Sequence, residues 1–139
     1  MMHSATKQEL MKAALAARDN AYVPYSRFAV GAAVEGASGR IYSGCNVENA
    51  SYGLTNCAER TAVFNAISAG ESKLLRLLVV ADTTGPVAPC GACRQVMQEF
   101  SIQEIILCNT SGDCMTVAMS ELLPYGFGPE QMKGAAVDE

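Results

Sequence analysis

The chain has 139 residues, of which half are apolar and 17% are charged, and its net charge is −4. This length and composition predict one domain, residues 1–139, that folds without disulfides to hold it together. The acidic balance excludes a protein whose affinity comes from neutralising phosphates, because that requires clustered Lys and Arg. We therefore expect a small-molecule partner and no nucleic acid. The high apolar fraction favours a homo-oligomer, in which copies of the chain cover apolar surface.

The sequence shows neither a membrane span nor a signal peptide. No segment reaches the roughly 18 consecutive apolar residues of a span, and the start of the chain lacks a long apolar core. We therefore expect a cytoplasmic location and no membrane partner. In that compartment the six cysteines are expected to be thiols, some of them metal ligands. The single histidine, His3, lies close to the start of the chain, and we expect no role for it.

The first third of the chain predicts a helix followed by a β-hairpin. Residues Thr6–Arg18 carry apolar side chains at helical spacing. After the break at Pro24, Phe28–Glu35 and Arg40–Val47 are predicted to be strands. The glycine-rich segment Gly36–Gly39 joins them and has the length of a hairpin connection.

Helices and strands alternate in the rest of the chain. A polar loop over 49–56 leads into a predicted helix at Cys57–Ile67, and a strand at Leu74–Ala81 follows. The segment 82–89 contains two prolines and ends where a second helix, Cys90–Phe100, begins. The remaining expected elements are a strand at Glu104–Cys108, a turn at Asn109–Asp113, a short strand at Met115–Val117, a short helix at Ser120–Leu123 and an irregular tail after Phe127.

This order of elements predicts an α/β fold. Strands that alternate with helices after an initial hairpin favour one mixed sheet with helices on both faces. Ligands of such sheets bind where strand ends meet helix starts. Two cysteine-containing motifs fall at junctions of this kind, so we expect a site there.

Three cysteines at these helix starts are candidate zinc ligands. Cys90 and Cys93 have the Cys-x-x-Cys spacing that lets two sulfurs reach one ion, and Cys57 begins the other helix. Helix N-termini lower the pKa of thiols, and a catalytic zinc site keeps its fourth position for water. Two alternatives stay open at this point: a redox pair of ordinary thiols, and a structural zinc site with Cys45 as fourth ligand.

Two charged neighbours of Cys57 fit a deamination reaction. Glu59 is the candidate proton shuttle, because attack of a zinc-activated water on an amidine-like carbon needs a base and then an acid. One Zn²⁺ and three thiolates add to a net charge of −1, and Arg60, on the same helical face as Cys57, is the candidate that offsets it. Without the neighbouring cysteines, Glu59 would be interpreted as an acidic residue that interacts favourably with the helix dipole, and Arg60 as a solvated surface charge. Cys-Ala-Glu combined with Pro-Cys-x-x-Cys is instead typical of zinc deaminases.

Nearly the whole chain resembles the small, homotetrameric cytidine deaminases. The segments that carry the resemblance are Pro24–Ala32, Asn46–Gly53, Cys57–Arg60, Pro89–Gln95, Leu122–Pro124 and Phe127. The resemblance implies a three-layer α/β/α fold with a five-stranded mixed sheet, one zinc ion per subunit, and a homotetramer whose active sites are shared between subunits. It also implies hydrolytic deamination of cytidine and 2′-deoxycytidine to the uridine forms with release of ammonia, in pyrimidine salvage.

The resemblance further implies which residues bind the nucleoside. Phe28 would stack on or flank the pyrimidine, and Asn46 and Glu48 would hold ribose hydroxyls, which both donate and accept hydrogen bonds. The backbone of Ala58 would contact the base, and a neighbouring subunit would lend Phe127. Without the resemblance, Phe28 and Phe127 would be packing residues. Asn46 and Glu48 would be ordinary polar loop residues.

Glu48 also bears on the choice of substrate. A carboxylate near the 3′-hydroxyl would repel a phosphate, which favours free nucleosides over nucleotides. Deamination of a nucleoside antibiotic such as blasticidin S is an alternative, against which the Asn-Val-Glu sugar element argues. Polynucleotide editing would need a basic groove that the composition does not provide. The remaining thiols, Cys45, Cys108 and Cys114, lie on or beside predicted strands and are assigned no chemistry.

Overall fold

The computed structural model describes residues 4–132, so His3 and the tail from residue 133 onward lie outside the described residues. The strands are β1 (Val30–Gly36), β2 (Ile41–Cys45), β3 (Leu74–Ala81), β4 (Glu104–Asn109) and β5 (Cys114–Ala118). The helices are α1 (Lys7–Arg18), α2 (Ala58–Ser68), α3 (Gly91–Glu99), α4 (Met119–Leu122) and a short 3₁₀ helix, η1 (Tyr52–Leu54). Within residues 4–132, no helix is both long and apolar enough to cross a membrane.

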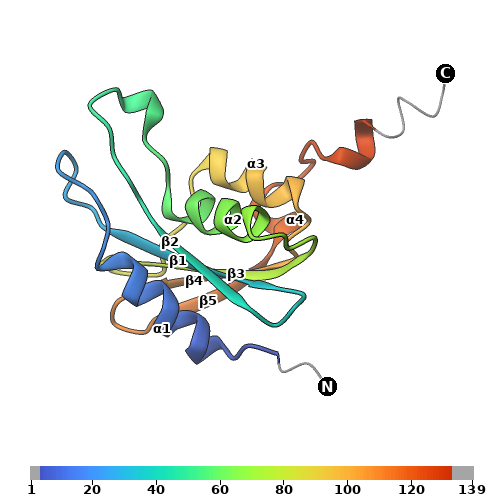
Figure 1. Cartoon of the computed structure of the whole chain (residues 1–139), viewed down its shortest axis with the longest axis horizontal. Coiled ribbons are helices and arrows are strands. Elements are labelled where there is room, and N and C mark those ends of the chain that lie inside the picture. The colour runs from blue at the N-terminus through green and yellow to red at the C-terminus, as the bar shows by residue number, and fades with distance from the viewer. Residues whose placement is uncertain (1–3, 133–139) are drawn as a thin grey trace.

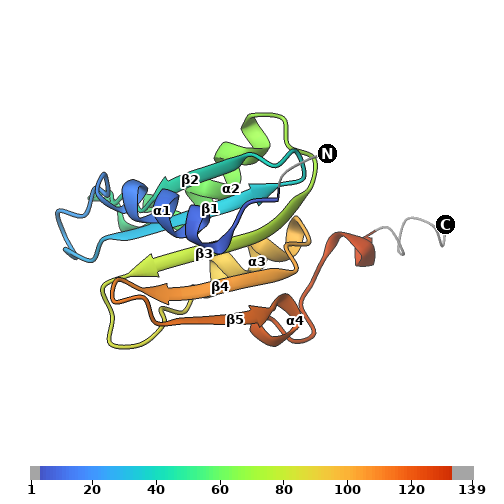
Figure 2. The same cartoon turned by 90° about the horizontal axis from the view of Figure 1, so that it is seen from below.

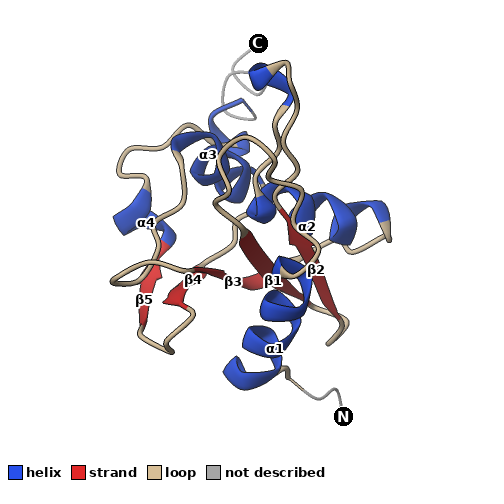
Figure 3. Cartoon of the chain, turned by 90° about the vertical axis from the view of Figure 1, so that its left-hand side faces the viewer, coloured by secondary structure: helices blue, strands red, loops and turns tan. Residues whose placement is uncertain are grey.

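All five strands form one mixed sheet in the order β2-β1-β3-β4-β5. Neighbouring strands are antiparallel except β3 and β4, which are parallel. Helix α1 covers one face, and α2 and α3 cover the other (Figure 1; Figure 3). The predicted α/β fold with a five-stranded sheet between two helical layers is therefore confirmed.

Alternate residues of the central strand β3 supply two separate cores. Leu78 and Val80 pack with Leu10 and Ala14 of α1, whereas Leu77 and its alternate neighbours pack beneath α2 and α3. The continuous apolar run Leu77–Ala81 fits this position, because this part of the strand is covered on both faces. Figure 2 shows α1 on the near side of the sheet, with α2 and α3 behind it.

Several predicted boundaries differ from the structure, most of them by one or two residues. The hairpin strands are shorter than predicted, since the ladder begins at Val30, which pairs with Ala81, and leaves Phe28 outside it. The tail after Phe127 was expected to be irregular, but residues 129–132 are helical. Proline at position 129 suits the first residue of a helix, because its fixed φ is helical and its missing N–H is not needed there.

A buried carboxylate ties the start of the chain to the sheet. Glu35 of β1 accepts hydrogen bonds from the Ala5 amide at 2.8 Å, the Ser4 hydroxyl at 3.1 Å and Arg76 Nε at 2.8 Å. Arg76 also donates to the Ala5 carbonyl. Burial raises the pKa of Glu35, but these hydrogen bonds outweigh it and hold that pKa below its ordinary value. Glu35 is therefore a charged anchor inside the fold.

The structure corrects the expectation that all six cysteines are thiols. Cys108 and Cys114 lie directly opposite each other on β4 and β5, with Cα atoms 4.2 Å apart, and are joined by a disulfide. The pairing depends on strand register, which the spacing of cysteines along the chain does not reveal. The other four cysteines are free, and three of them gather where α2 and α3 begin, at the site described next.

Candidate active site

The sulfurs of Cys57, Cys90 and Cys93 meet where α2 and α3 begin. Cys57 and Cys90 are the N-cap residues of these helices, and Cys93 lies in the first turn of α3. Cys90 Sγ is 3.6 Å from Cys57 Sγ and 3.4 Å from Cys93 Sγ, and all three sulfurs lie within 4.8 Å of one another. Thiolates bound tetrahedrally to one zinc ion at ~2.3 Å would lie about 3.8 Å apart. The donor set therefore fits a zinc ion.

The electrostatics of the sulfur cluster also favour a cation. A hydrogen bond with Cys93 lowers the pKa of Cys57 to about 5, and Arg60 acts in the same direction. The same pair interaction, together with burial, raises the pKa of Cys93. Cys57 is thus the more readily ionised of the two thiols, and a divalent metal would favour ionisation of both, because metal ligands must be deprotonated.

Arg60 lies beside the cluster, as its position three residues after Cys57 indicates. Its Nη2 donates to Cys57 Sγ at 3.3 Å, and this hydrogen bond raises the pKa of Arg60. Its Nε atom is buried and is the one such side-chain nitrogen or oxygen without a partner among residues 4–132. Arg60 therefore brings its positive charge next to the Cys57 thiolate. There it can offset the net negative charge of a zinc site with three thiolates.

Glu59 shares a cavity with Cys57 and Cys90. The cavity has a volume of about 170 Å³ and is lined by Phe28, Val30, Asn46, Cys57, Ala58, Glu59, Val87, Ala88 and Cys90. Only 5% of Glu59 is exposed. Burial raises its pKa to about 7, and the charge of Cys57 adds to the effect. A carboxyl group with this pKa can both accept and donate a proton near neutral pH.

Two of the predicted nucleoside-binding side chains reach this cavity. Phe28 is 42% exposed and forms part of the wall. The amide of Asn46 is fixed by the backbone, since Oδ1 accepts from the Val30 amide at 2.9 Å and Nδ2 donates to the Phe28 carbonyl at 2.8 Å. These bonds leave one amide hydrogen and one lone pair of Asn46 for a ligand. Ala58 is buried at the start of α2.

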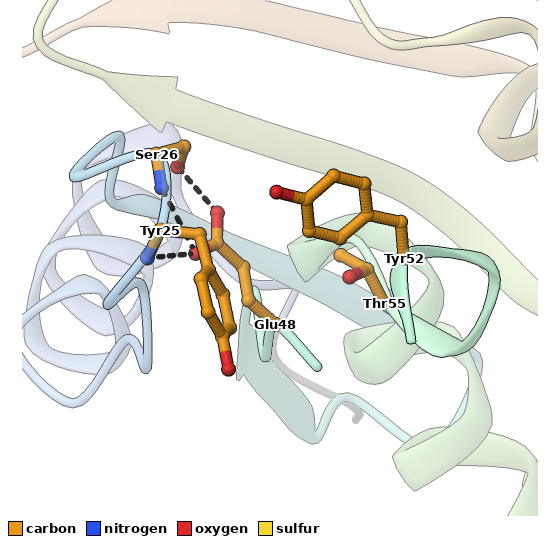
Figure 4. Close-up of a pocket in the computed structure, with 5 residues that line it drawn as sticks. All are labelled: Tyr25, Ser26, Glu48, Tyr52 and Thr55. Carbon is orange, nitrogen blue, oxygen red and sulfur yellow. Dashed lines mark hydrogen bonds between the residues drawn. The ribbon is translucent and has the colours of Figure 1, made fainter. Parts of the chain in front are cut away.

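Glu48 lines a separate hollow of about 320 Å³, with Tyr25, Ser26, Tyr52 and Thr55 (Figure 4). Its carboxylate accepts from the amides of Tyr25 and Ser26, at 2.9 and 3.1 Å, and from the Ser26 hydroxyl. The hydroxyl bond is the largest cause that lowers the pKa of Glu48. Glu48 follows Asn46 by two residues, so at most about 7 Å of chain separates it from the first cavity.

Phe127 and Cys45 lie outside the group that the structure brings together. Phe127 is 56% exposed and lines neither hollow, although its carbonyl accepts from Gln95 Nε2 at 2.9 Å. Cys45 does not belong to the sulfur cluster, and the described residues provide no fourth cysteine there. The alternative of a closed four-cysteine site therefore has no support within residues 4–132.

Sequence reasoning missed three residues of the cavity wall: Val30 at the start of β1, Val87 and Ala88. Val87 and Ala88 line it from the loop between β3 and α3. They are small apolar residues without a motif of their own, and only the neighbouring Pro-Cys-x-x-Cys element marked the region. Their position follows from where the loop runs, which no pattern in the sequence encodes.

Comparison with known proteins decides the family. Residues 4–109 match the model of the cytidine and deoxycytidylate deaminase zinc-binding region. The chain is 54% identical to the cytidine deaminase of Halalkalibacterium halodurans, over 91% of this chain and 97% of that protein. It is 50% identical to the cytidine deaminase of Sporosarcina psychrophila, over 93% and 96%. This chain belongs to the cytidine deaminase family.

Solved cytidine deaminase structures have the same fold. The crystal structure from Burkholderia pseudomallei matches with a TM-score of 0.85 at 51% identity, and the match covers 88% of this chain and 100% of that one. The structure from Mycobacterium tuberculosis matches with a TM-score of 0.77 at 42% identity, over 90% and 99%. The family's zinc-binding region includes Cys57, Cys90 and Cys93, which form the zinc-binding triad of this cytidine deaminase family member.

Proposed function

We propose that the protein hydrolyses cytidine and 2′-deoxycytidine to uridine and 2′-deoxyuridine with release of ammonia, as a step of pyrimidine salvage. The observation that carries this proposal is the buried Glu59, which shares one cavity with two of the zinc-binding cysteines, Cys57 and Cys90. Relatives named cytidine deaminase at 54% and 50% identity support the same substrate.

In this proposal the protein provides a proton relay and a charge balance. Zinc held by Cys57, Cys90 and Cys93 would supply a water of lowered pKa as nucleophile. The Glu59 carboxylate accepts one proton of that water and donates it to N3 of the pyrimidine. It then takes the second proton of the water, from the hydroxyl now on C4, and delivers it to the leaving amine. Its pKa of about 7 suits both directions of transfer. Arg60 offsets the negative charge of the thiolates across the 3.3 Å contact with Cys57.

The nucleoside lies across the two hollows. Phe28 flanks the base, and the start of α2 at Ala58 offers backbone N–H groups that have no partner within the helix. The free hydrogen and lone pair of Asn46, together with the Glu48 carboxylate, hold the ribose hydroxyls. Glu48 is ionised at neutral pH, because its hydrogen bonds lower its pKa. It therefore disfavours a phosphate on the sugar.

An ultraviolet assay tests the activity directly. Cytidine, 2′-deoxycytidine and cytidine 5′-monophosphate are compared at equal concentration, with blasticidin S as a further substrate. We expect turnover of the two nucleosides and much slower turnover of the nucleotide and the antibiotic. Glu48→Gln should raise KM for cytidine. It should also reduce the difference in turnover between cytidine and cytidine 5′-monophosphate. Zinc-loaded protein that deaminates none of the nucleosides would refute the proposed function.

The protein is also proposed to form a homotetramer with shared active sites. Large side chains are exposed near the second hollow, including Tyr52 at 75% and Leu54 at 71%, and a second chain could cover them. Phe127 is exposed and away from the cavity of its own chain. If a neighbour uses Phe127, Glu59→Gln and Phe127→Ala chains are each impaired alone but recover part of the activity when refolded together. No recovery in the mixture would contradict shared sites.

A cytoplasmic location is proposed because the zinc-binding cysteines must stay reduced. The disulfide between Cys108 and Cys114 is the opposing observation. Cell fractionation tests the location directly. We expect the protein in the cytoplasmic fraction, and its recovery outside that fraction would contradict the proposal.

A further inference from the structure

The loop between β3 and α3, residues 82–90, forms part of the cavity wall and is called the site loop below. It brings Val87, Ala88 and Cys90 to the cavity. No helix or strand lies within it, so contacts with neighbouring elements determine its position. Its two ends are held differently.

Asn109 holds the beginning of the site loop. This residue ends β4 and is only 1% exposed. Its Nδ2 atom donates to the carbonyls of Thr83 and Thr84 at 3.0 and 3.1 Å, and it lies 3.1 Å from Asp113 Oδ2. Its Oδ1 atom accepts from the amides of Ser111 and Asp113 at 3.1 and 2.9 Å. One buried amide thus joins the β4–β5 turn to the site loop.

The loop has other contacts as well: the Thr110 hydroxyl donates to Asp82 Oδ1 at 3.1 Å, the Thr83 hydroxyl donates to the Gly85 carbonyl at 2.6 Å, and Val87 packs against the core beneath α2 and α3. The Val87 amide donates to the Cys108 carbonyl at 3.4 Å, which is long for such a bond. Arg94 of α3 donates from Nε to the Pro89 carbonyl at 3.0 Å and so fixes the end next to Cys90. Among these contacts, Asn109 is the buried side chain outside the loop whose hydrogen bonds reach Thr83 and Thr84, directly before the wall-forming segment.

We propose that Asn109 is a positioning residue for deamination, which holds the site loop where Val87 and Ala88 close the substrate cavity. This inference rests on the proposed deaminase activity. If the amide donors are removed, the loop is competent for only part of the time, and the apparent affinity for substrate falls by that fraction. Glu59 belongs to α2 and not to the loop, and Arg94 fixes the end of the loop that carries Cys90, so we expect turnover of bound substrate to be unaffected.

Two substitutions remove the anchor in different ways. Asn109→Asp keeps acceptors for the Ser111 and Asp113 amides but has no hydrogen to donate to Thr83 and Thr84. Asn109→Ser is neutral and too short to reach the loop, and it serves if the charged variant does not fold. Gly112→Ala is the matched control, because φ at this position is +95° and the space around its Cβ is open. It strains the same turn without touching the loop.

Steady-state kinetics with cytidine, well below the melting temperature, separate positioning from stability. We expect both Asn109 variants to raise KM roughly threefold to tenfold, the effect of losing one or two hydrogen bonds, with kcat within about twofold of the wild type. Gly112→Ala should lower the melting temperature and leave KM unchanged. Hydrogen exchange should show faster exchange of the Val87 amide in the Asn109 variants only.

The alternative outcomes are distinct. Unchanged KM in both Asn109 variants, with an active wild type, overturns the positioning role. An equal rise of KM in Gly112→Ala overturns it as well, since general loosening of the turn would then explain the effect. An inactive wild type contradicts the proposed function instead, and exchange at Val87 still decides whether Asn109 holds the loop.

Discussion

Replacement of Glu59 by Gln isolates the proton relay from the metal site. Gln has nearly the same shape, so it fits a position that is 5% exposed, but it cannot accept or donate the transferred proton. Each general acid–base transfer contributes about 10²- to 10⁴-fold to the rate, and Glu59 serves at least two of them. We therefore expect kcat to fall by at least about 10⁴-fold, or about 5 kcal/mol in the barrier.

Zinc content and stability show whether the loss is chemical. Zinc per chain should stay at the wild-type level, because Glu59 is not among the clustered ligands. Burial raises the pKa of Glu59 to about 7, so the folded state is penalised for holding the carboxylate above that pH. Glu59→Gln should thus be no less stable than the wild type at pH 8.

Glu99→Gln, on the exposed surface of α3, is the matched control and should keep full activity. Activity of Glu59→Gln within tenfold of wild type would refute the role.

Three further changes have separable effects. Arg60→Gln should lower activity about 10- to 100-fold, measured at equal zinc content, because groups behind metal ligands typically have effects of this size. Glu35→Gln should lower the free energy of unfolding in urea by about 1.5–3 kcal/mol at pH 7. Since the pKa of Glu35 lies below its ordinary value of 4.5, that difference is full above pH 4.5 and disappears as the pH falls through the lowered pKa. Cys114→Ser should cost about 2 kcal/mol through loss of a cross-link six residues apart, and a reductant should then have no further effect.

Local sequence patterns were sufficient to predict the helices and strands and to identify the zinc-binding cysteines. The predicted strand Leu74–Ala81 matches β3 at both ends, and its part Leu77–Ala81, which is buried on both faces, has a continuous apolar sequence. Cys57, Cys90 and Cys93 were found because N-cap positions and a short spacing are visible along the chain. Family resemblance, rather than spacing, directed attention to Phe28.

Features that depend on three-dimensional register could not be predicted in the same way. The Cys108–Cys114 disulfide requires the two cysteines to face each other across β4 and β5, which is a property of pairing. The separation of Glu48 from the sulfur cavity depends on the path of an irregular segment. Asn109 has no motif, and its importance follows only from the loop that packs against it.

Zinc titration tests the central claim most directly. The protein is stripped with a chelator, zinc is added back in steps, and cytidine absorbance is followed at each step alongside bound zinc per chain. We predict that the stripped protein is inactive and that activity rises in proportion to bound zinc until it saturates at one ion per chain. Full turnover without metal, or no turnover at one bound zinc per chain, would contradict the account.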